Sequence, residues 1–439
     1  MIRLPTLRRL SFLLPLLLLS ACGSGRSSNA GAPVIESFSA SPARVNAGRE
    51  VTLSWRVRDA DRLLLLPGNI DVTGTNEISL PVTDNGAFAL QASNERGSRT
   101  QPAKVVLYDW RAVGDALDSA VSAGTIDGAS FALIDRDGPL YTAERGDIAL
   151  NQMVPLASAS KLPTVMAILT LVDTGQLALD RPVGDYLARD AGFDWPADKA
   201  AITLRMLLAH TAGFVGLGDT QPDCLLLERL STLRDCAQAI AKTTLVAAPG
   251  SAFNYGGADM QVAAYVATLV SGEDWQDLFA GRIGSPLGLG GLLSYGDPAV
   301  VSNPRVAGGA VASAPAYARL LRVLLNDGLY DGRRVLSTAM VAELLRNQTT
   351  GLPVLYQPFP ADRTTDYPGY GLGVFISAPR LHPGSSGPEY SDPGLFGATP
   401  WIDLGLGYGG VLLIESTTDV GLDLWDQLRP LVIRQLTGS

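Results

Sequence analysis

The amino-acid sequence predicts a multidomain chain in which a small all-β sandwich is followed by a larger α/β domain. Three observations support this fold class. Residues 33 to 108 contain period-two strand patterns separated by turn signals, a helical apolar repeat follows Ser158, and the apolar run Val411–Ile414 is typical of a strand. A chain of 439 residues with 46% hydrophobic residues is long enough to bury two cores.

The chain begins with the pattern of a signal peptide. Basic residues at Arg3, Arg8 and Arg9 precede an apolar run that ends at Leu19. A run of this length is typical of a cleaved or processed leader and is short for a membrane-spanning helix.

The leader ends in a sequence that resembles the bacterial lipobox, Leu19-Ser-Ala-Cys22. In such a motif the cysteine is acylated and becomes the first residue. We therefore expect residues 1–22 to be a lipoprotein signal, Cys22 to carry the lipid, and residues 23–32 to be a flexible tether. Residue 23 is glycine rather than the aspartate of an inner-membrane retention signal. This favours the outer membrane, so the chain is expected on the periplasmic side of a bacterial cell envelope.

Residues 33–108 are expected to form a β-sandwich. Alternating segments such as Val51–Val57 are set off by turn signals such as Asp84-Asn-Gly86, and Trp55 is the expected core residue. The module resembles bacterial immunoglobulin-like domains, although no cysteine pair spans its sheets. A spacer and an adhesion or glycan-binding module are both compatible with this pattern, and we favour the spacer.

The catalytic candidates begin with Ser158 and Lys161, which form a Ser-x-x-Lys motif ahead of a helical pattern. Three residues are nearly one helical turn, so the amine can reach the hydroxyl and activate it as a nucleophile. Pro163 fits in a first turn, and Gly175 marks the expected end of the helix. The alternative is that a serine-rich helix start followed by a lysine arises by chance.

Tyr255 is the candidate partner of this pair. It stands in a glycine-rich turn that leads into an apolar, helix-like stretch. A nearby lysine cation is expected to lower its pKa, so that it can shuttle a proton between Ser158 and the leaving group. The alternative is a packing aromatic at the end of a loop.

Other chemistries are poorly represented. The chain has two histidines and no Gly-x-Ser-x-Gly elbow, which disfavours a Ser-His-Asp hydrolase. The run Gly405–Gly410 matches a dinucleotide fingerprint, but an apolar strand and no helix follows it, so we interpret it as a turn between two strands. No zinc-type spacing of histidines or cysteines is present, and we expect neither a metal nor a cofactor.

Residues 111 to about 437 resemble the serine β-lactamase-related superfamily of the class C type, which includes D-alanyl-D-alanine carboxypeptidases and family VIII esterases. The resemblance lies in Pro155–Lys161, Leu171–Val183, Leu204–Phe214, Gly371–Val374 and Gly397–Asp403, in the family's order. It implies that residues 109–439 form an α/β domain with an antiparallel sheet flanked by helices and a helical subdomain. It also implies that His210 is a structural residue.

Two departures from the family pattern bear on function. The second motif, usually Tyr-x-Asn, ends here in Gly257, so the amide that would hold a substrate carbonyl is absent. The third motif, usually Lys-Thr-Gly or His-x-Gly, aligns with Asp392-Pro-Gly394, which places an aspartate in the expected substrate cleft. The resemblance implies that the backbone N–H groups of Ser158 and Leu395 form the oxyanion hole.

The remaining cysteines, Cys224 and Cys236, are expected to pair in an exported protein, the alternative being two free buried thiols.

Two classes of function remain open. One is a serine hydrolase that forms an acyl-enzyme on Ser158 and accepts a small-molecule ester, amide or cell-wall peptide. Asp392 would repel a substrate carboxylate, which favours an esterase or amidase. The other is a non-catalytic envelope protein that keeps the fold to bind peptidoglycan or a partner. A net charge of −9 argues against nucleic-acid binding, and we expect a monomer.

Overall fold

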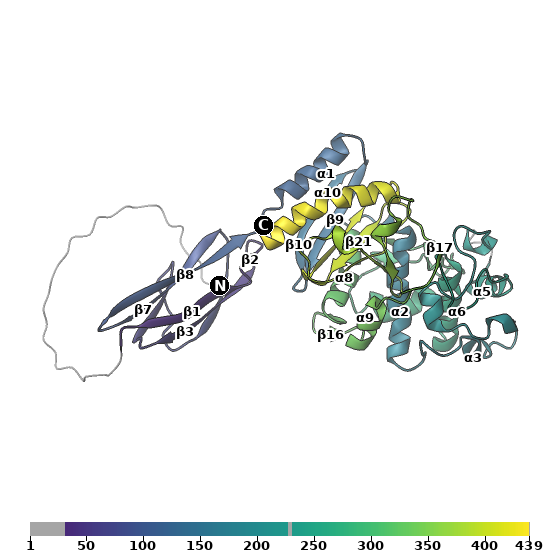
Figure 1. Ribbon diagram of the computed structural model, residues 1–439, viewed down its shortest axis with the longest axis horizontal. Helices are drawn as coiled ribbons and strands as arrows, with labels where there is room; N and C mark the ends of the chain where they lie inside the picture. Colours follow the sequence, from purple (N-terminus) through teal and green to yellow (C-terminus); the bar gives the residue numbers. More distant parts are fainter. Residues whose placement is uncertain (1–30, 227–230, 439) are drawn as a thin grey trace. The chain divides into compact units, whose positions relative to one another are not determined.

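The computed structural model describes residues 31–226 and 231–438 (Figure 1). The predicted signal, the lipid site at Cys22 and most of the tether lie outside the described residues. The chain divides after Leu107 into two compact units, each of which has its own core.

The first unit consists of two sheets that share one apolar core. The strands are β1 (Val34–Ser41), β2 (Arg44–Val45), β3 (Glu50–Arg58), β4 (Arg62–Leu66), β5 (Ile70–Asp71), β6 (Glu77–Pro81), β7 (Gly86–Asn94) and β8 (Gly97–Leu107). One sheet has the order β1-β3-β6 and the other β2-β8-β7-β4-β5. Alternate residues of β3, among them Val51, Leu53 and Trp55, point into the core, as the period-two pattern predicts.

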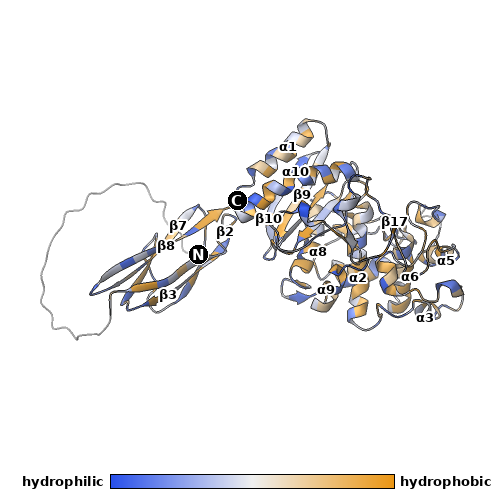
Figure 2. Ribbon diagram, in the orientation of Figure 1, coloured by the Kyte–Doolittle hydropathy of each residue, from blue (hydrophilic) through white to orange (hydrophobic). Residues whose placement is uncertain are grey.

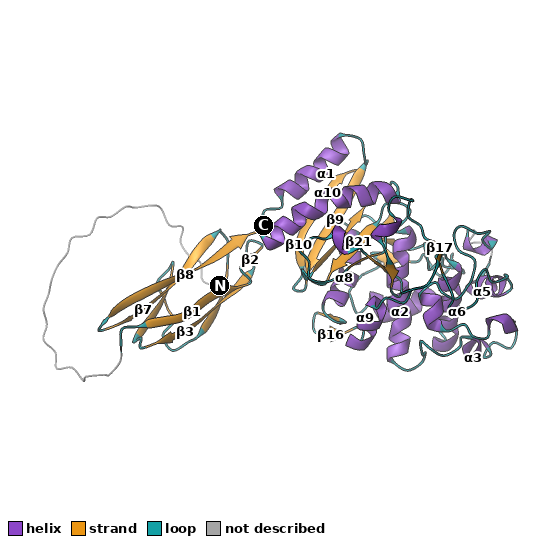
Figure 3. Ribbon diagram, in the orientation of Figure 1, coloured by secondary structure: helices purple, strands orange, loops and turns teal. Residues whose placement is uncertain are grey.

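A seven-stranded antiparallel sheet organises the second unit (Figure 3). Its strand order is β10 (Pro139–Gly146), β9 (Gly128–Asp135), β22 (Tyr408–Leu413), β21 (Thr399–Asp403), β20 (Glu389–Ser391), β19 (Phe375–Ile376) and β18 (Gly369–Tyr370). Residues 404–407 form the turn between β21 and β22, so the glycine-rich run lies at a turn between two strands and continues into β22.

Helices cover both faces of this sheet and form a separate helical region. On one face lie α1 (Arg111–Ser122) and α10 (Thr418–Thr437), and α8 (Ala314–Leu325) lies on the other face (Figure 1). The helical region contains α2 (Lys161–Asp173), α3 (Gly184–Leu187), α4 (Leu204–Leu208), α5 (Leu233–Ala241), α6 (Ala258–Ser271), α7 (Trp275–Phe279) and α9 (Thr338–Leu345). The predicted α/β architecture of this unit is confirmed.

Short paired strands lie within the loops around the helical region. They are β11 (Val154–Pro155), β12 (Phe253–Asn254), β13 (Leu293–Ser294), β14 (Val311–Ala312), β15 (Leu329–Tyr330), β16 (Arg333–Arg334) and β17 (Val354–Tyr356). β12 pairs with β17, so the segment before Tyr255 lies beside the segment that ends at Tyr356.

The two central helices, α2 and α6, are apolar along most of their length (Figure 2). The α2 residues from Lys161 to Leu171 are all buried, and α2 and α6 pack against each other. A helix that is apolar on every side belongs in the interior of a protein. This burial gives the start of α2, where the Ser-x-x-Lys motif lies, a fixed position.

Candidate active site

Ser158 and Lys161 lie at the start of α2. A single 3-10 turn, Ala157–Ser160, carries Ser158 and continues directly into α2. Lys161 Nζ donates hydrogen bonds to Ser158 Oγ at 3.2 Å and to the carbonyl oxygen of Ala307 at 2.9 Å. The carbonyl fixes the amine against the serine, as nucleophilic activation by a lysine requires.

The backbone is strained next to Ser158. Ala157 has a φ of 45°, in the left-handed region that non-glycine residues rarely occupy. Such strain persists only where neighbouring structure holds it. Here, the carbonyl of Ala310 accepts the N–H of Leu156, and the Ser160 hydroxyl accepts the N–H of Ala310.

Tyr255 lies between β12 and α6 and is fully buried. Lys161 Nζ lies over its ring, 4.4 Å from the centroid. Burial raises the pKa of Tyr255 well above its usual value, and the charge of Asp392 raises it further, whereas Ser158 opposes the shift. The expectation of a lowered pKa is therefore wrong, because desolvation of the phenolate outweighs the nearby lysine.

Asp392 follows β20 directly, and its side chain is buried rather than facing the substrate. It is 1% exposed, and its Oδ2 accepts the N–H of Leu162 at 3.2 Å. It does not line the cleft that contains Ser158. The prediction that Asp392 repels a substrate carboxylate at close range is therefore corrected, because this carboxyl group is directed at the first turn of α2.

Lys161 and Asp392 influence each other's protonation. Burial lowers the pKa of Lys161 to about 8, and the charge of Asp392 opposes this shift. Burial likewise raises the pKa of Asp392 to about 8, with Lys161 and the N–H groups at the start of α2 opposing the shift. A lysine with a pKa of about 8 is neutral in about one tenth of the molecules at pH 7 and in half of them at pH 8, and a general base must be neutral.

The turn after β20 brings the third motif against the turn that carries Ser158. A Cβ atom at Gly394 would lie 2.0 Å from the carbonyl oxygen of Leu156, so only glycine fits here. Gly394 thus packs against the turn that carries Ser158. It does not itself line the cleft, in contrast to the prediction that it does. The Gly394 N–H donates to the Ala398 carbonyl at 2.7 Å, which closes the turn and presents Leu395 and Phe396.

Ser158 and Leu395 line the same cleft. Among the described residues, neither backbone N–H has a hydrogen-bond acceptor. Two unengaged N–H groups beside a nucleophile are what stabilisation of an oxyanion needs.

The cleft has a volume of about 330 Å³. Gly257 lines it, as predicted from the second motif, together with Gln261 one turn further along α6. The Gln261 amide is engaged by Asn303 and by the backbone of Pro304 and Val306. Lys161 and Arg305 are the charged residues among the described residues of the cleft wall.

A second buried pair lies behind Tyr255. The His210 ring is centred 4.9 Å from the Tyr255 ring, and its Nδ1 is 3.7 Å from Asp259 Oδ2. Burial lowers the pKa of His210 and raises the pKa of Asp259. His210 does not line the cleft, so its contacts support the expected structural role.

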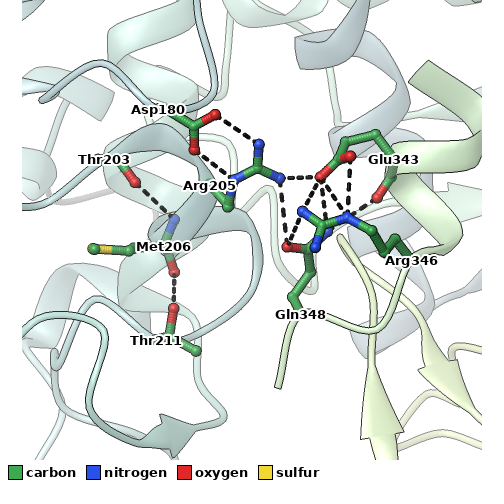
Figure 4. Close-up of polar contacts among 8 residues, drawn as sticks. All are labelled: Asp180, Thr203, Arg205, Met206, Thr211, Glu343, Arg346 and Gln348. Carbon is green, nitrogen blue, oxygen red and sulfur yellow. Dashed lines mark hydrogen bonds and ion pairs between the residues drawn. The ribbon is translucent and has the colours of Figure 1, made fainter. Parts of the chain in front are cut away.

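A cluster of polar contacts anchors the α4 segment that leads to His210. Arg205 lies between Asp180, on one side, and Glu343 and Gln348, on the other (Figure 4). The hydroxyl of Thr203 caps α4 by accepting the Met206 N–H. These contacts tie α4 to α9 and fix the loop that packs against Tyr255.

The predicted disulfide is present. Cys224 and Cys236 are bonded and connect the short helix Asp223–Leu225 to α5. Leu225 lines the cleft, so the disulfide fixes part of the cleft wall.

No cluster of three potential metal ligands occurs within residues 31–226 and 231–438. Over the same ranges, no helix is both long enough and apolar enough to cross a bilayer.

Several residues around Ser158 were not singled out from the sequence. Ala307 contributes only its carbonyl group, which no side-chain pattern reports. Four side chains from segments distant in the sequence also line the cleft: Leu217, Tyr356, Phe359 and Phe396. The exposure of Leu217 and Phe396 became visible only in the structure.

Comparison with known proteins gives a family assignment. The family model described as Beta-lactamase matches residues 113–429. Penicillin-binding protein 4 of Amycolatopsis lactamdurans is 27% identical over 243 residues, covering 49% of this chain and 61% of its own length. The esterase/beta-lactamase LipL of Mycobacterium tuberculosis is 26% identical over 304 residues, covering 56% of this chain and 65% of its own length. The chain thus spans slightly less than two thirds of these two relatives.

A solved structure of a family VIII carboxylesterase shares the fold. It superposes with a TM-score of 0.62 at 19% sequence identity, over 74% of this chain and 97% of that chain.

Proposed function

The chain belongs to the Beta-lactamase family, and from this premise we propose that it is a serine hydrolase that forms an acyl-enzyme on Ser158. The observation that carries the proposal is the 3.2 Å contact between Lys161 Nζ and Ser158 Oγ at the cleft. Similar proteins are described as a penicillin-binding protein, an esterase/beta-lactamase and a family VIII carboxylesterase. Among these activities, we propose an esterase or amidase.

Acylation begins with neutral Lys161. Ser158 Oγ forms a bond to the acyl carbon, and its proton passes to Lys161 Nζ. The carbonyl oxygen becomes an oxyanion, which the N–H groups of Ser158 and Leu395 stabilise. When the bond to the leaving group breaks, the leaving oxygen or nitrogen takes a proton from the Lys161 ammonium.

Deacylation repeats these steps with water. Lys161 accepts a proton from the attacking water, and Ser158 regains a proton when the acyl bond breaks. Tyr255 is a neutral phenol at neutral pH, because its pKa is raised well above the usual value by burial. It therefore serves as a hydrogen-bond donor and as the aromatic face that holds Lys161, not as a phenolate base.

The preference for a neutral substrate that we propose does not rest on repulsion by Asp392, as the sequence suggested. Asp392 is buried and acts on Lys161. The third motif nevertheless supplies no lysine to bind a carboxylate, and its turn instead presents Leu395 and Phe396 to the cleft. We therefore propose that neutral esters and amides are preferred to penicillins and D-alanyl peptides.

The test is intact-mass detection of a covalent adduct after incubation with a fluorophosphonate, a panel of activated esters and a penicillin. We expect the fluorophosphonate and the esters to add one adduct, mapped to Ser158. A protein that remains unmodified by every reagent and hydrolyses no ester would contradict the proposal. That outcome would favour the second candidate, a non-catalytic envelope protein, which the loss of the amide at Gly257 supports.

We further propose that the enzyme is attached to the bacterial cell envelope through Cys22, with the outer membrane favoured. In this proposal the first unit, an immunoglobulin-like module, acts as a spacer and the protein is monomeric. The supporting observation is the leader sequence that ends in Leu-Ser-Ala-Cys22. Wild-type protein should incorporate labelled fatty acid and partition with membranes. Cys22→Ala should do neither, whereas Ser24→Ala, two residues beyond, should behave as wild type.

A further inference from the structure

Exposed apolar side chains gather around the nucleophile. The relative exposure of Leu217 is 47%, of Leu226 62%, of Leu395 64% and of Phe396 44%, and all four line the cleft. Single exposed apolar residues are common on protein surfaces. A group of them around one cleft indicates a surface that binds an apolar partner.

These side chains come from two segments that are distant in the sequence. Leu217 and Leu226 belong to the loop after α4, and Leu395 and Phe396 to the turn between β20 and β21. A third segment, formed by the end of β17 and the loop that follows it, adds Tyr356 and Phe359 to the same wall. Because three separate segments contribute apolar side chains beside Ser158, their exposure is not that of a single residue exposed by chance.

The apolar part of the wall, rather than its two cationic residues, indicates the kind of ligand. No aspartate or glutamate lines the cleft among the described residues, and its charged members are Lys161 and Arg305. Lys161 is engaged in the hydrogen bonds to Ser158 and Ala307. The remainder of the wall is largely apolar, so it stabilises a neutral chain through burial from water.

We infer that this cleft selects neutral esters whose acyl group is an apolar chain of medium length, which packs against Leu217, Leu395 and Phe396. The inference rests on the proposed acyl-enzyme at Ser158 and names its substrate class. The acyl chain is the part of such a substrate that stays in the cleft after the alcohol has left. An apolar wall around the acyl chain therefore acts in both halves of the reaction.

The test is a series of nitrophenyl esters with one leaving group and increasing acyl length: acetate, butyrate, hexanoate and octanoate. Burial of one methylene contributes about 0.8 kcal/mol, so kcat/KM should rise about fourfold per added methylene until the chain fills the cleft. Leu217→Ser combined with Phe396→Ser should lower kcat/KM for octanoate by about fifteenfold or more, which corresponds to the burial of two methylenes, and should lower kcat/KM for acetate by a clearly smaller factor. Val300→Ser, at a position that is exposed but outside the cleft, should leave the series unchanged.

A measurement without turnover separates this inference from the proposed function. In Ser158→Ala, calorimetric titration should show tighter binding of the octanoate ester than of the acetate ester. Fluorophosphonate labelling of Ser158 with a chain-length series that is flat or falls would overturn the inference and leave the hydrolase proposal standing. Absence of labelling and turnover, with chain-length-dependent binding to Ser158→Ala, would overturn the hydrolase proposal and leave an apolar binding site. A protein that shows no labelling, no turnover and no chain-length-dependent binding would overturn both the hydrolase proposal and this inference.

Discussion

Lys161 Nζ lies 3.2 Å from Ser158 Oγ and 4.4 Å from the centre of the Tyr255 ring, so one amine contacts both the serine hydroxyl and the aromatic ring. Burial lowers the pKa of Lys161 to about 8 and raises that of Tyr255 well above its usual value. The two groups are thus shifted in opposite directions, and both shifts favour the neutral form. These shifts support the roles proposed above, in which Lys161 is the base and Tyr255 is a hydrogen-bond donor.

Ser158→Ala should abolish ester turnover and adduct formation without a large change in the thermal midpoint. The hydroxyl forms a hydrogen bond with Lys161 and does not cap α2. One such bond contributes about 1 kcal/mol to stability. Intact-mass spectrometry and a thermal melt check both parts. An adduct that still forms on Ser158→Ala would place the nucleophile at another residue.

Lys161→Ala should reduce kcat nearly as much as Ser158→Ala, and the double variant should be no slower than either single variant. Members of one proton-transfer unit are strongly non-additive, because losing one member leaves the others without function. Lys199→Ala is the matched control, since Lys199 is also 2% exposed but lies outside the cleft. It should retain activity. Additive losses in the double variant would show that Lys161 and Ser158 act separately.

The sequence predicted those parts of the site that depend on local geometry. Ser158 and Lys161 are three residues apart at a helix start, and Tyr255 follows a glycine-rich turn ahead of α6, so short-range spacing places each of them. The helix end near Gly175 follows from the same kind of rule, because its φ of 72° suits glycine. The architecture of the second unit could be predicted because several motifs occur in the order that is typical of the family.

Features that depend on contacts between residues distant in the sequence could not be predicted from sequence patterns. The position of Asp392 in the third motif did not reveal which way its side chain points, because its contact with the N–H of Leu162 in the first turn of α2 decides that. The lysine next to Tyr255 suggested a lowered pKa, but full burial, which is a property of the folded chain, reverses the direction. The carbonyl of Ala307 reaches Lys161 from 146 residues away.

The rate should depend on pH through Lys161. A base must be neutral, so kcat/KM should rise as the pH increases through about 8, the pKa to which burial lowers Lys161. The charge of Asp392 raises the pKa of Lys161, so Asp392→Asn should lower that pKa and move the acidic limb of the profile to lower pH. Profiles of kcat/KM for a neutral ester measure the shift.

Asp277→Asn, which changes an exposed aspartate on α7, should leave the pH profile in place. A shift of the Asp392→Asn limb to higher pH, or no shift at all, would remove Asp392 from the environment of Lys161.

Gly394→Ala should damage both activity and stability through a single steric contact. The added Cβ would lie 2.0 Å from the carbonyl oxygen of Leu156 and 3.5 Å from the Cβ of Ala157, the residue before the nucleophile. Either the turn after β20 or the strained turn at Ala157 must move, which separates the N–H of Leu395 from that of Ser158. Overpacking of this kind typically costs about 1–3 kcal/mol, and displacement of one oxyanion donor costs about a hundredfold in kcat. Gly281→Ala is the control, because a Cβ there meets no atom within 4 Å. It should leave kcat unchanged, and equal kcat for the two variants would show that the approach of Gly394 to Leu156 does not position the oxyanion hole.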